Sequence, residues 1–480
     1  MGHLLLGATR NLPLALEEAA AYLEETHSGL SRYLELVRER SRELFASDDP
    51  AAGGETTDHH RVATVWSVSL DRVRQEEPTA EALLDLCGFL APELPRDLPT
   101  EQPQVLPAAL AAAVVDPIAY NRMLAVIGRY SLATVTPSTV GMHRLVQAVV
   151  QVRLDRDEER AWAETASSLI RASFPDLGWM LPTWPSCERL LPSLFTVTAH
   201  ARRLQVAPEQ TGWLLNRAAV NLRARGQYLQ AKPLAEKALT LAQRTLGPDH
   251  PETAQRHDTL GRVMQNLGDL AGARAEHEQA LRIGLAALGP DDITVGTSRG
   301  NLGRVLGLMD EPHAARAQLE QSVRITEAVL GPDHHDVGIR RGNLGIVLQH
   351  LGDLDDARTE LERSVQIIES ALGPDHHDVG IRRGYLGWAL QGSGDLDGAR
   401  TELGLAVQIT EAALGPDHPT VGNLRGSLAL VLEELGDLDG ALAQLEQAVR
   451  ITDAALGPDH PTVVGIRGDL ERLLSNRQPT

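Results

Sequence analysis

A fixed internal repeat of 42 residues dominates the C-terminal half of this chain. The segment LGPDHHDVGIRRG occurs at 330–342 and again, unchanged, at 372–384. The shorter phrase Leu-Gly-Pro-Asp recurs in the same register, and its glycines are Gly247, Gly289, Gly331, Gly373, Gly415 and Gly457. A period of about 20–50 residues indicates stacked structural repeats, in which each unit contacts mainly its neighbours.

Each repeat has the pattern of a helical hairpin. Within 338–372, apolar residues recur at helical spacing in two runs, Leu344, Val347, Leu348 and Leu351, then Ala357, Leu361, Val365, Ile368 and Leu372. The Leu-Gly-Asp-Leu-Asp segment between the runs offers a glycine helix stop and an aspartate cap. In Leu-Gly-Pro-Asp we expect the glycine to end the second helix and the aspartate to help start the next one.

This pattern resembles the tetratricopeptide repeat (TPR), with small residues at Gly345 and Ala357 and leucines at Leu344 and Leu361. The length beyond 34 residues and the LGPDHP connector are similar to the subtype found in kinesin light chains. The resemblance implies a mainly α protein with a right-handed superhelix of six helical hairpins at 211–458. A capping helix is expected at 459–480.

The first third of the chain resembles another family. NLPLALEEAAAYL is similar to the Gly-Leu-Pro-Leu motif of NB-ARC ATPases of the STAND class, with Asn11 in place of the first glycine and matches at Leu12, Pro13 and Leu14. VTPST resembles a wing turn between two short strands, and Met142-His143-Arg144 stands where the family has Met-His-Asp.

The chain as a whole therefore resembles the C-terminal part of an actinobacterial NB-ARC–TPR protein. The resemblance implies a helical remnant at 1–56, a winged-helix-like domain at 57–155 and a helical linker at 156–210. In the family, Pro13 would touch adenine and His143 a phosphate. We expect structural roles for both here, because neither of the only lysines, Lys232 and Lys237, lies in a Gly-x4-Gly-Lys-Ser/Thr phosphate loop.

Composition narrows the classes of partner. A net charge of −20 disfavours a nucleic-acid or anionic-membrane binder, since both need a basic face. Two isolated cysteines, Cys87 and Cys187, argue against a disulfide framework, and no apolar run is long enough to span a bilayer. We expect a cytoplasmic protein without a cofactor. Whether it is a natural short protein or a fragment of a longer ATPase, and its oligomeric state, are left open.

A histidine column accompanies the connectors: His250, His334, His376, His418 and His460, with His335 and His377 beside two of them. Equivalent positions in stacked hairpins lie roughly 8–10 Å apart, whereas zinc–nitrogen bonds are about 2 Å long. Turn and helix-start chemistry therefore explains the column, and no metal site is predicted.

The predicted working surface is the groove lined by the first helices, with these candidate residues: Arg299, Asn301, Arg341, Asn343, Gln349, His350, Arg383, Tyr385, Trp388, Gln391 and Arg425. The arginine column, which continues to Arg467, reads either as a carboxylate-binding ladder or as internal ion pairs with acids such as Glu360 and Glu362. Tyr385 and Trp388 are the best candidates for a specificity patch, and core packing of one of them is the alternative.

A glycine column lies beside these arginines, at Gly300, Gly342, Gly384, Gly426 and Gly468. Glycine inside a helix costs roughly 1 kcal/mol relative to alanine, so the column indicates either a need for space along the groove or simple duplication. We find no nucleophile–base pair and predict a non-catalytic scaffold that binds a peptide or protein segment, in bacterial signalling or regulation. The alternative is a small-molecule-binding or biosynthetic protein that uses a glycine-widened groove.

Overall fold

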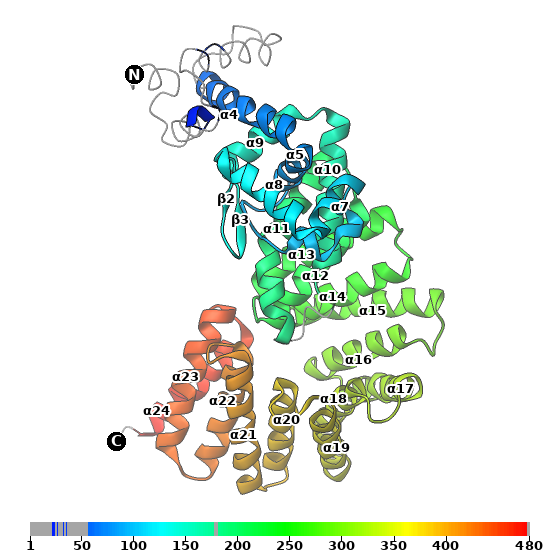
Figure 1. The fold of residues 1–480 in the computed structure, drawn as a ribbon. Coiled ribbons are helices and arrows are strands. Elements are labelled where there is room, and N and C mark those ends of the chain that lie inside the picture. Colours follow the sequence, from blue (N-terminus) through cyan, green and yellow to red (C-terminus); the bar gives the residue numbers. More distant parts are fainter. Residues whose placement is uncertain are drawn as a thin grey trace. The chain divides into compact units, whose positions relative to one another are not determined.

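The computed structural model describes residues 56–176 and 181–477, together with Tyr22, Leu23, Glu24, Thr26, Arg32 and Glu35. The predicted motif at 11–14 lies outside the described residues. The chain divides into two compact units, one made of residues 1–176 and 185–214 and the other of 177–184 and 215–480. The first unit is drawn in blue to green in Figure 1 and the second in green to red.

The first unit is helical with one small sheet. Its elements are α4 (Thr56–Glu76), α5 (Pro78–Cys87), β1 (Glu93–Pro95), α6 (Leu98–Glu101), the 3-10 turn η1 (Pro103–Val105), α7 (Ala108–Val115), α8 (Pro117–Arg129), β2 (Thr134–Val135), β3 (Thr139–Gly141), α9 (Arg144–Arg153), α10 (Arg156–Ser173) and most of α11 (Trp184–Leu204). The helices α10 and α11, which cover the predicted linker, belong to this compact unit.

The Val-Thr-Pro-Ser-Thr segment forms a hairpin at the predicted position. Strands β2 and β3 pair antiparallel with Val135 opposite Val140, and β1 pairs with the other edge of β3. The Thr136 hydroxyl accepts a hydrogen bond from the Thr139 amide at 2.8 Å, which closes the turn. Threonine at the first turn position thus supplies a side-chain acceptor that stabilises the reversal.

Helix α9 packs firmly into this unit. Its N-cap is His143, whose Nδ1 accepts a hydrogen bond from the Leu145 amide at 3.2 Å. Val146 and Val150 are buried, and the buried Gln147 amide donates to the carbonyls of Cys87 and Leu90 at 2.9 and 3.0 Å. One polar side chain therefore satisfies two main-chain acceptors beyond the end of α5.

The second unit consists of helical hairpins, in the number that the period predicts. The hairpins are α12 (Pro208–Ala224) with α13 (Tyr228–Thr245), α14 (Pro251–Asn266) with α15 (Leu270–Ala287), α16 (Ile293–Leu308) with α17 (Pro312–Leu330), α18 (His335–Leu351) with α19 (Leu354–Leu372), α20 (His377–Gly392) with α21 (Leu396–Leu414), and α22 (Pro419–Glu434) with α23 (Leu438–Leu456). A last helix, α24 (Pro461–Arg477), follows, and a short 3-10 turn η2 (Leu181–Thr183) also belongs to this unit.

The second helices end where the repeated glycine predicts. Gly331, Gly373, Gly415 and Gly457 are C-caps with φ of 87°, 87°, 89° and 86°. Positive φ is open to glycine because it lacks a Cβ atom. The repeated phrase therefore serves as a helix stop in each of these hairpins.

The aspartate of Leu-Gly-Asp caps the second helix only where glycine stands three residues later. Asp395 accepts a hydrogen bond from the amide of Gly398 at 3.0 Å, and a Cβ atom at Gly398 would lie 2.6 Å from the same carboxylate. The repeat used above for the prediction has Asp356 at that place. Its Asp353 makes no cap bond and instead pairs with Arg316 at 2.9 Å, so the expected cap at this position was wrong.

The expectation for the connector aspartate was also wrong. Asp333 does not cap α18 but pairs with Arg363 of α19, the second helix of the same hairpin, at 3.0 Å. The N-cap is the next residue, His334, whose Nδ1 accepts from the Asp336 amide at 3.2 Å. The histidine column, rather than the aspartate, therefore supplies the helix-start chemistry.

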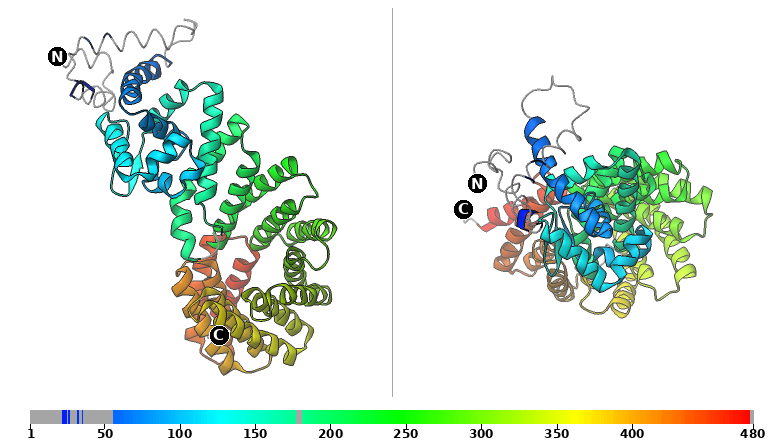
Figure 2. Two further views of the ribbon diagram at one scale, coloured as in Figure 1. Left: turned by 45° about the vertical axis from the view of Figure 1, so that its right-hand side comes forward. Right: turned by 45° about the horizontal axis from the view of Figure 1, so that its top comes forward.

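The repeat unit curves until its sixth hairpin meets its first. Nε2 of His418, at the start of α22, lies 3.2 Å from the carbonyl oxygen of Ala224 at the end of α12. A Cβ atom at Gly226 would lie 2.7 Å from Cδ of Pro419. The left view of Figure 2 shows the orange α22 beside the green end of α12.

The second hairpin repeats this contact with the capping helix. A Cβ atom at Gly268 would lie 3.2 Å from Cδ of Pro461 and 3.3 Å from Nε2 of His460. Both contacts join elements five hairpins apart, so the curvature of one hairpin after another brings the array back on itself after five.

The described helices offer no single membrane-spanning segment. None of them is both long and apolar enough to cross a bilayer alone, and α7 with α8, bent by 106°, reaches the required length and composition only as a pair.

Candidate functional site on the first helices

The predicted glycine column does not widen a groove. Gly300, Gly342 and Gly384 are buried between helices. A Cβ atom at Gly300 would lie 2.7 Å from the Ser322 hydroxyl and 2.9 Å from Cδ of Arg340. At Gly342 the corresponding neighbours are Ser364 Oγ at 2.7 Å and an Arg382 guanidinium nitrogen at 2.9 Å. These glycines therefore give room to side chains of adjacent helices.

The end of the same column has no such neighbour. No atom lies within 4 Å of a Cβ atom built at Gly468, which is exposed on α24. The column thus combines both predicted explanations, since the earlier glycines are required by packing whereas Gly468 fits a copied residue without a packing role.

The predicted arginine column forms internal ion pairs, which was the second of the two alternatives given above. Arg341 pairs with Glu360 at 2.7 Å and with Glu327 at 2.5 Å. Arg383 pairs with Glu402 at 2.9 Å and with Glu369 at 3.0 Å. Each of these arginines links the second helices of two successive hairpins through the first helix between them. Glu362 takes no part, because it pairs with Arg358 on its own helix at 2.7 Å.

The other members of the column have weaker partners. Arg299 donates to Gln318 at 2.7 Å. Arg425 joins Gln444 at 2.7 Å and Glu411 at 2.6 Å. Engaged in this way, the column has little free donor capacity for a ligand.

Two predicted residues contact Trp388, and we call Gln349, His350, Trp388 and the nearby Gln391 the Trp388 patch. The His350 ring meets the Trp388 ring edge-on, with centroids 5.1 Å apart. The Gln349 amide donates to the Trp388 carbonyl at 3.1 Å, and Gln391 donates to Glu434 at 2.6 Å. Trp388 is half-buried. The patch therefore joins three successive first helices, α18, α20 and α22.

Gln349 reaches α20 because Gly392 has no side chain. A Cβ atom at Gly392 would lie 2.8 Å from Nε2 of Gln349. The Oε1 atom of Gln349 is buried without a hydrogen-bond partner. An unsatisfied buried acceptor costs about 1–3 kcal/mol.

Tyr385 has a different environment from Trp388. Its ring packs partly against the core of Leu386, Leu403 and neighbouring residues, and the Arg382 guanidinium lies 4.8 Å from the ring centre. The alternative prediction, that one of the two aromatics packs into the core, therefore holds for Tyr385. The two predicted asparagines, Asn301 and Asn343, are also buried and bond to Asp258 at 3.4 Å and Arg382 at 3.3 Å, respectively.

A second set of arginines was missed by the sequence analysis. Arg223, Arg262, Arg304, Arg340 and Arg382 come from the first helices of five successive hairpins, and we call them the arginine cluster. Burial lowers the pKa of Arg223 and of Arg304 to about 10. The positive charge of Arg223, together with burial, lowers the pKa of Arg262 to about 9. All three remain charged at neutral pH.

The signal for the cluster was present but incomplete. Arg340 and Arg382 are the first arginines of the duplicated Arg-Arg-Gly, and the preceding glycines Gly300 and Gly342 make room for them. Arg262 and Arg304 are 42 residues apart and share a second repeat position, and Arg223 stands at a third, so the curvature of the unit is what brings the three positions together.

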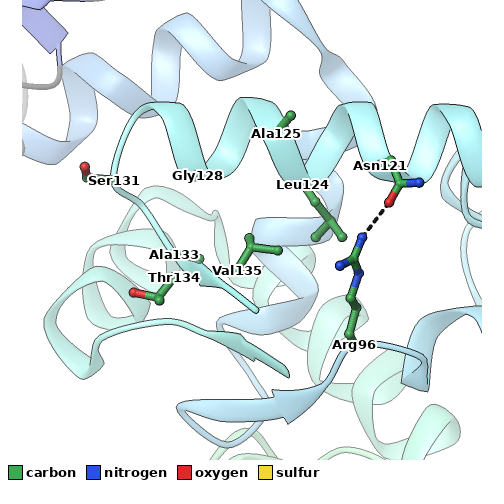
Figure 3. A pocket seen from close by; sticks show the side chains of 9 residues that line it. All are labelled: Arg96, Asn121, Leu124, Ala125, Gly128, Ser131, Ala133, Thr134 and Val135. Atoms are coloured by element: carbon green, nitrogen blue, oxygen red, sulfur yellow. Dashed lines mark hydrogen bonds between the residues drawn. The ribbon is translucent and has the colours of Figure 1, made fainter. Parts of the chain in front are cut away.

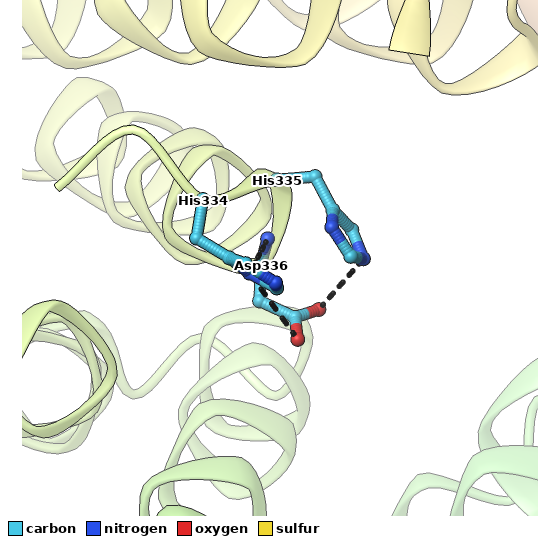
Figure 4. Close-up of side chains that lie close together, drawn as sticks. All are labelled: His334, His335 and Asp336. Carbon is cyan, nitrogen blue, oxygen red and sulfur yellow. Dashed lines mark hydrogen bonds and ion pairs between the residues drawn. The ribbon is translucent and has the colours of Figure 1, made fainter. Parts of the chain in front are cut away.

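The histidine column caps the first helices, as predicted. Nδ1 of His250, His334, His376, His418 and His460 accepts from the amide two residues later at 3.2 Å. Figure 4 shows His334, His335 and Asp336, whose potential ligand atoms lie within 4.8 Å of one another, and the same holds for the repeat at 376–378. Since Nδ1 of His334 is engaged in capping, this ring could offer only Nε2 to a metal.

One hollow of about 540 Å³ lies in the first unit between α8 and the β2–β3 hairpin. Figure 3 shows Arg96 at its edge, bonded to Asn121 at 2.5 Å, and Arg96 also donates to the Thr136 carbonyl at 3.2 Å. The sequence analysis did not anticipate this hollow. Its wall contains no titratable group other than Arg96.

Comparison with known proteins decides the family. The profile of the tetratricopeptide repeat matches residues 210–284, 257–328, 294–358, 338–403 and 389–454, which together span more than half of the sequence. The chain belongs to the tetratricopeptide repeat family. The TPR profile begins within α12 and ends within α23, so it covers the six hairpins described above.

One curated protein is similar to about half of this chain. A nucleotide-binding leucine-rich repeat (NLR)-like protein of Hyaloscypha variabilis is 24% identical over 258 residues, which are 51% of this chain and 24% of that protein. The TPR chain therefore spans about a quarter of the length of this relative.

Three solved structures are also similar to this chain. BtubC of P. vanneervenii is 23% identical and covers 47% of this chain and 91% of its own, with a TM-score of 0.39. A putative kinesin light chain of Podospora anserina is 23% identical over 43% of this chain and 97% of its own, with a TM-score of 0.35. A STAND protein with a TPR sensor from Pyrococcus horikoshii is 11% identical. The match covers 97% of this chain and 70% of that protein's chain, with a TM-score of 0.46.

Proposed function

We propose that this TPR protein is a non-catalytic scaffold that captures an extended segment of a partner protein on its first-helix face. TPR proteins are generally scaffolds for protein interaction, which supports the coarse assignment. The finer proposal includes a cytoplasmic role in bacterial signalling or regulation.

The observation that carries the proposal is the Trp388 patch. Trp388 keeps part of its ring exposed while His350 fixes its orientation and Gln349 holds the main chain below it. A rigid aromatic ring beside amide groups suits an extended peptide, because the ring supplies contact area and the amides pair with main-chain groups. Neighbouring side chains occupy the space beside the glycines at 300, 342 and 384. The alternative of a glycine-widened pocket therefore loses its basis.

The test begins with peptides selected from a random library on the full-length protein, whose Kd values are then measured by fluorescence anisotropy. Trp388→Ala should weaken binding by about 30-fold, since a buried aromatic anchor contributes about 2 kcal/mol. The matched control is Leu405→Ala in the second helix of the same hairpin, where Leu405 is 37% exposed.

Melting curves of the same variants separate binding from folding. We expect the melting temperature of Trp388→Ala to stay close to that of the parent protein. An early-melting Trp388→Ala protein whose folded fraction binds peptides normally would show that the ring is a core residue, and the proposal would fail.

A further inference from the structure

The arginine cluster gathers positive charge at one centre of the repeat unit. Arg304 of the third hairpin interacts electrostatically with Arg262, Arg340 and Arg382, which belong to the second, fourth and fifth hairpins. It also interacts with Arg223 of the first hairpin. Because one side chain has neighbours from four other hairpins, the five guanidinium groups converge rather than follow a line.

These arginines lack the partners that the predicted column has. Among the described residues, no carboxylate lies within the ion-pair distance of 4.0 Å of Arg223, Arg262, Arg304, Arg340 or Arg382. Instead, Arg340 donates to the Thr297 hydroxyl at 3.3 Å and Arg382 donates to the Asn343 amide oxygen at 3.3 Å. Neutral acceptors of this kind leave the guanidinium charges uncompensated.

Three acids act on the cluster at longer range, Asp258, Asp336 and Asp378. Asp258 bonds to His277 at 2.7 Å and to Ser298 at 2.5 Å. Asp336 faces His334 at 3.8 Å, and Asp378 faces His376 at 3.7 Å. Three carboxylates at longer range do not neutralise five arginines.

Two members of the cluster are buried with spare donors. Arg340 and Arg382 are 9% and 6% exposed, and their Nε atoms have no hydrogen-bond partner. The glycine column seats both side chains, at the cost of about 1 kcal/mol per helix-interior glycine. The Nε atom of Arg262 is also buried without a hydrogen-bond partner, while the Arg223, Arg262 and Arg304 residues each keep some exposed surface.

We propose that the arginine cluster binds a compact anion that carries two or more phosphate groups. Phosphate offers three acceptor oxygens and nearly two negative charges in a small volume, and the guanidinium fork binds it through paired hydrogen bonds. Five forks that converge on one centre match such an anion better than an extended acidic peptide, whose charges are spread along a line.

This inference goes beyond the proposed peptide capture and does not depend on it. The arginine cluster and the Trp388 patch use different side chains. The test of the phosphate site needs no partner protein, so it can fail while peptide binding persists.

The experiment is a calorimetric titration of the full-length protein with inorganic tripolyphosphate at low ionic strength. Arg304→Gln and Arg262→Gln, on two different hairpins, should each weaken binding by about 10-fold or more. The control is Arg358→Gln, which removes the same charge from an exposed second-helix position paired with Glu362, and its Kd should stay within about twofold of the parent value.

Thermal melts add a readout that a purely structural role would not give. Without ligand, Arg304→Gln should melt above the parent protein, because the change relieves repulsion between like charges. Tripolyphosphate should raise the melting temperature of the parent protein but not that of Arg304→Gln.

Further ligands identify the source of the phosphate groups. Tighter binding of fructose 1,6-bisphosphate than of tripolyphosphate would assign the site to an organic phosphate ester, and the reverse would assign it to an inorganic polyphosphate. The proposal is overturned if neither compound binds at about 1 mM, or if Arg358→Gln weakens binding as much as Arg304→Gln. It is also overturned if a hexaglutamate peptide binds more tightly than both phosphate compounds.

Discussion

The same substitution at two equivalent glycines should change the stability of the repeat unit in opposite directions. Gly342 in α18 and Gly468 in α24 occupy one column of the repeat, and each follows an arginine. Gly342→Ala and Gly468→Ala remove the same helix-interior glycine, so both gain about 0.5–1 kcal/mol from the smaller backbone entropy of alanine. Only their neighbours differ.

At Gly342 the new methyl group meets two side chains. Ser364 Oγ would lie 2.7 Å away and an Arg382 guanidinium nitrogen 2.9 Å away. The arginine is flexible at its end, but Ser364 is fully buried and donates to the Gly338 carbonyl at 2.6 Å. If the hydroxyl rotates away, that lost bond costs about 1–3 kcal/mol. The net effect is a loss of about 1 kcal/mol.

At Gly468 the methyl group meets no atom within 4 Å. The full helix-propensity gain of about 0.5–1 kcal/mol should therefore appear as added stability. The two variants should differ by roughly 2 kcal/mol, which corresponds to several degrees in the melting temperature of a unit of this size.

The assay compares urea midpoints and calorimetric melts of the parent protein and both variants. Circular dichroism at low temperature checks that helix content is unchanged. If Gly342→Ala stabilises the protein as much as Gly468→Ala, then the glycines at 300 and 342 do not seat neighbouring side chains, and the packing explanation of the column is refuted.

Two more outcomes follow from the ion pairs and from the contact between the ends of the repeat unit. Arg383→Ala should lower the free energy of unfolding by about 1–2 kcal/mol, because its half-buried guanidinium holds Glu369 and Glu402 together. Arg358→Ala, which removes an exposed ion pair, should lower it by less than about 0.5 kcal/mol. Equal losses for the two variants in urea titrations would contradict this. Burial lowers the pKa of His418 to about 4, from 6.5 in the unfolded chain, so its contribution to stability is complete above pH 6.5 and is lost as the pH falls toward 4. His418→Asn keeps an N-cap residue but removes the ring beside Ala224. The variant should therefore be less stable at pH 7, and its stability should fall less than that of the parent protein between pH 6.5 and 4. An unchanged fall in melting temperature across that range would count against the buried neutral ring.

The sequence by itself determined the local structure of this protein. Helix stops at Gly331 and Gly373, the histidine caps and the hairpin period are written in residues that are close together in the chain, and the structure has them where the pattern placed them. The local errors also have local causes. Asp353 does not cap its helix because the residue three positions on is Asp356, whereas the capping aspartates are followed at that distance by glycine.

The environment of the candidate site was predicted less completely. Around Trp388 the structure brings together Gln349 and His350, which the sequence analysis had named with it. The ion pairs of Arg341 and Arg383 were one of two alternatives, and only the positions of Glu360 and Glu402 across the hairpin selected it.

Tertiary structure alone decided how far the repeat unit curves. Small rotations between successive hairpins add up over the array. A difference in rotation that is negligible within one repeat therefore changes which hairpins meet after five. His418 therefore reaches Ala224, 194 residues away in the chain. For the same reason, five arginines that stand at three different repeat positions come together, because the accumulated curvature, and not any residue nearby in the sequence, sets their neighbours.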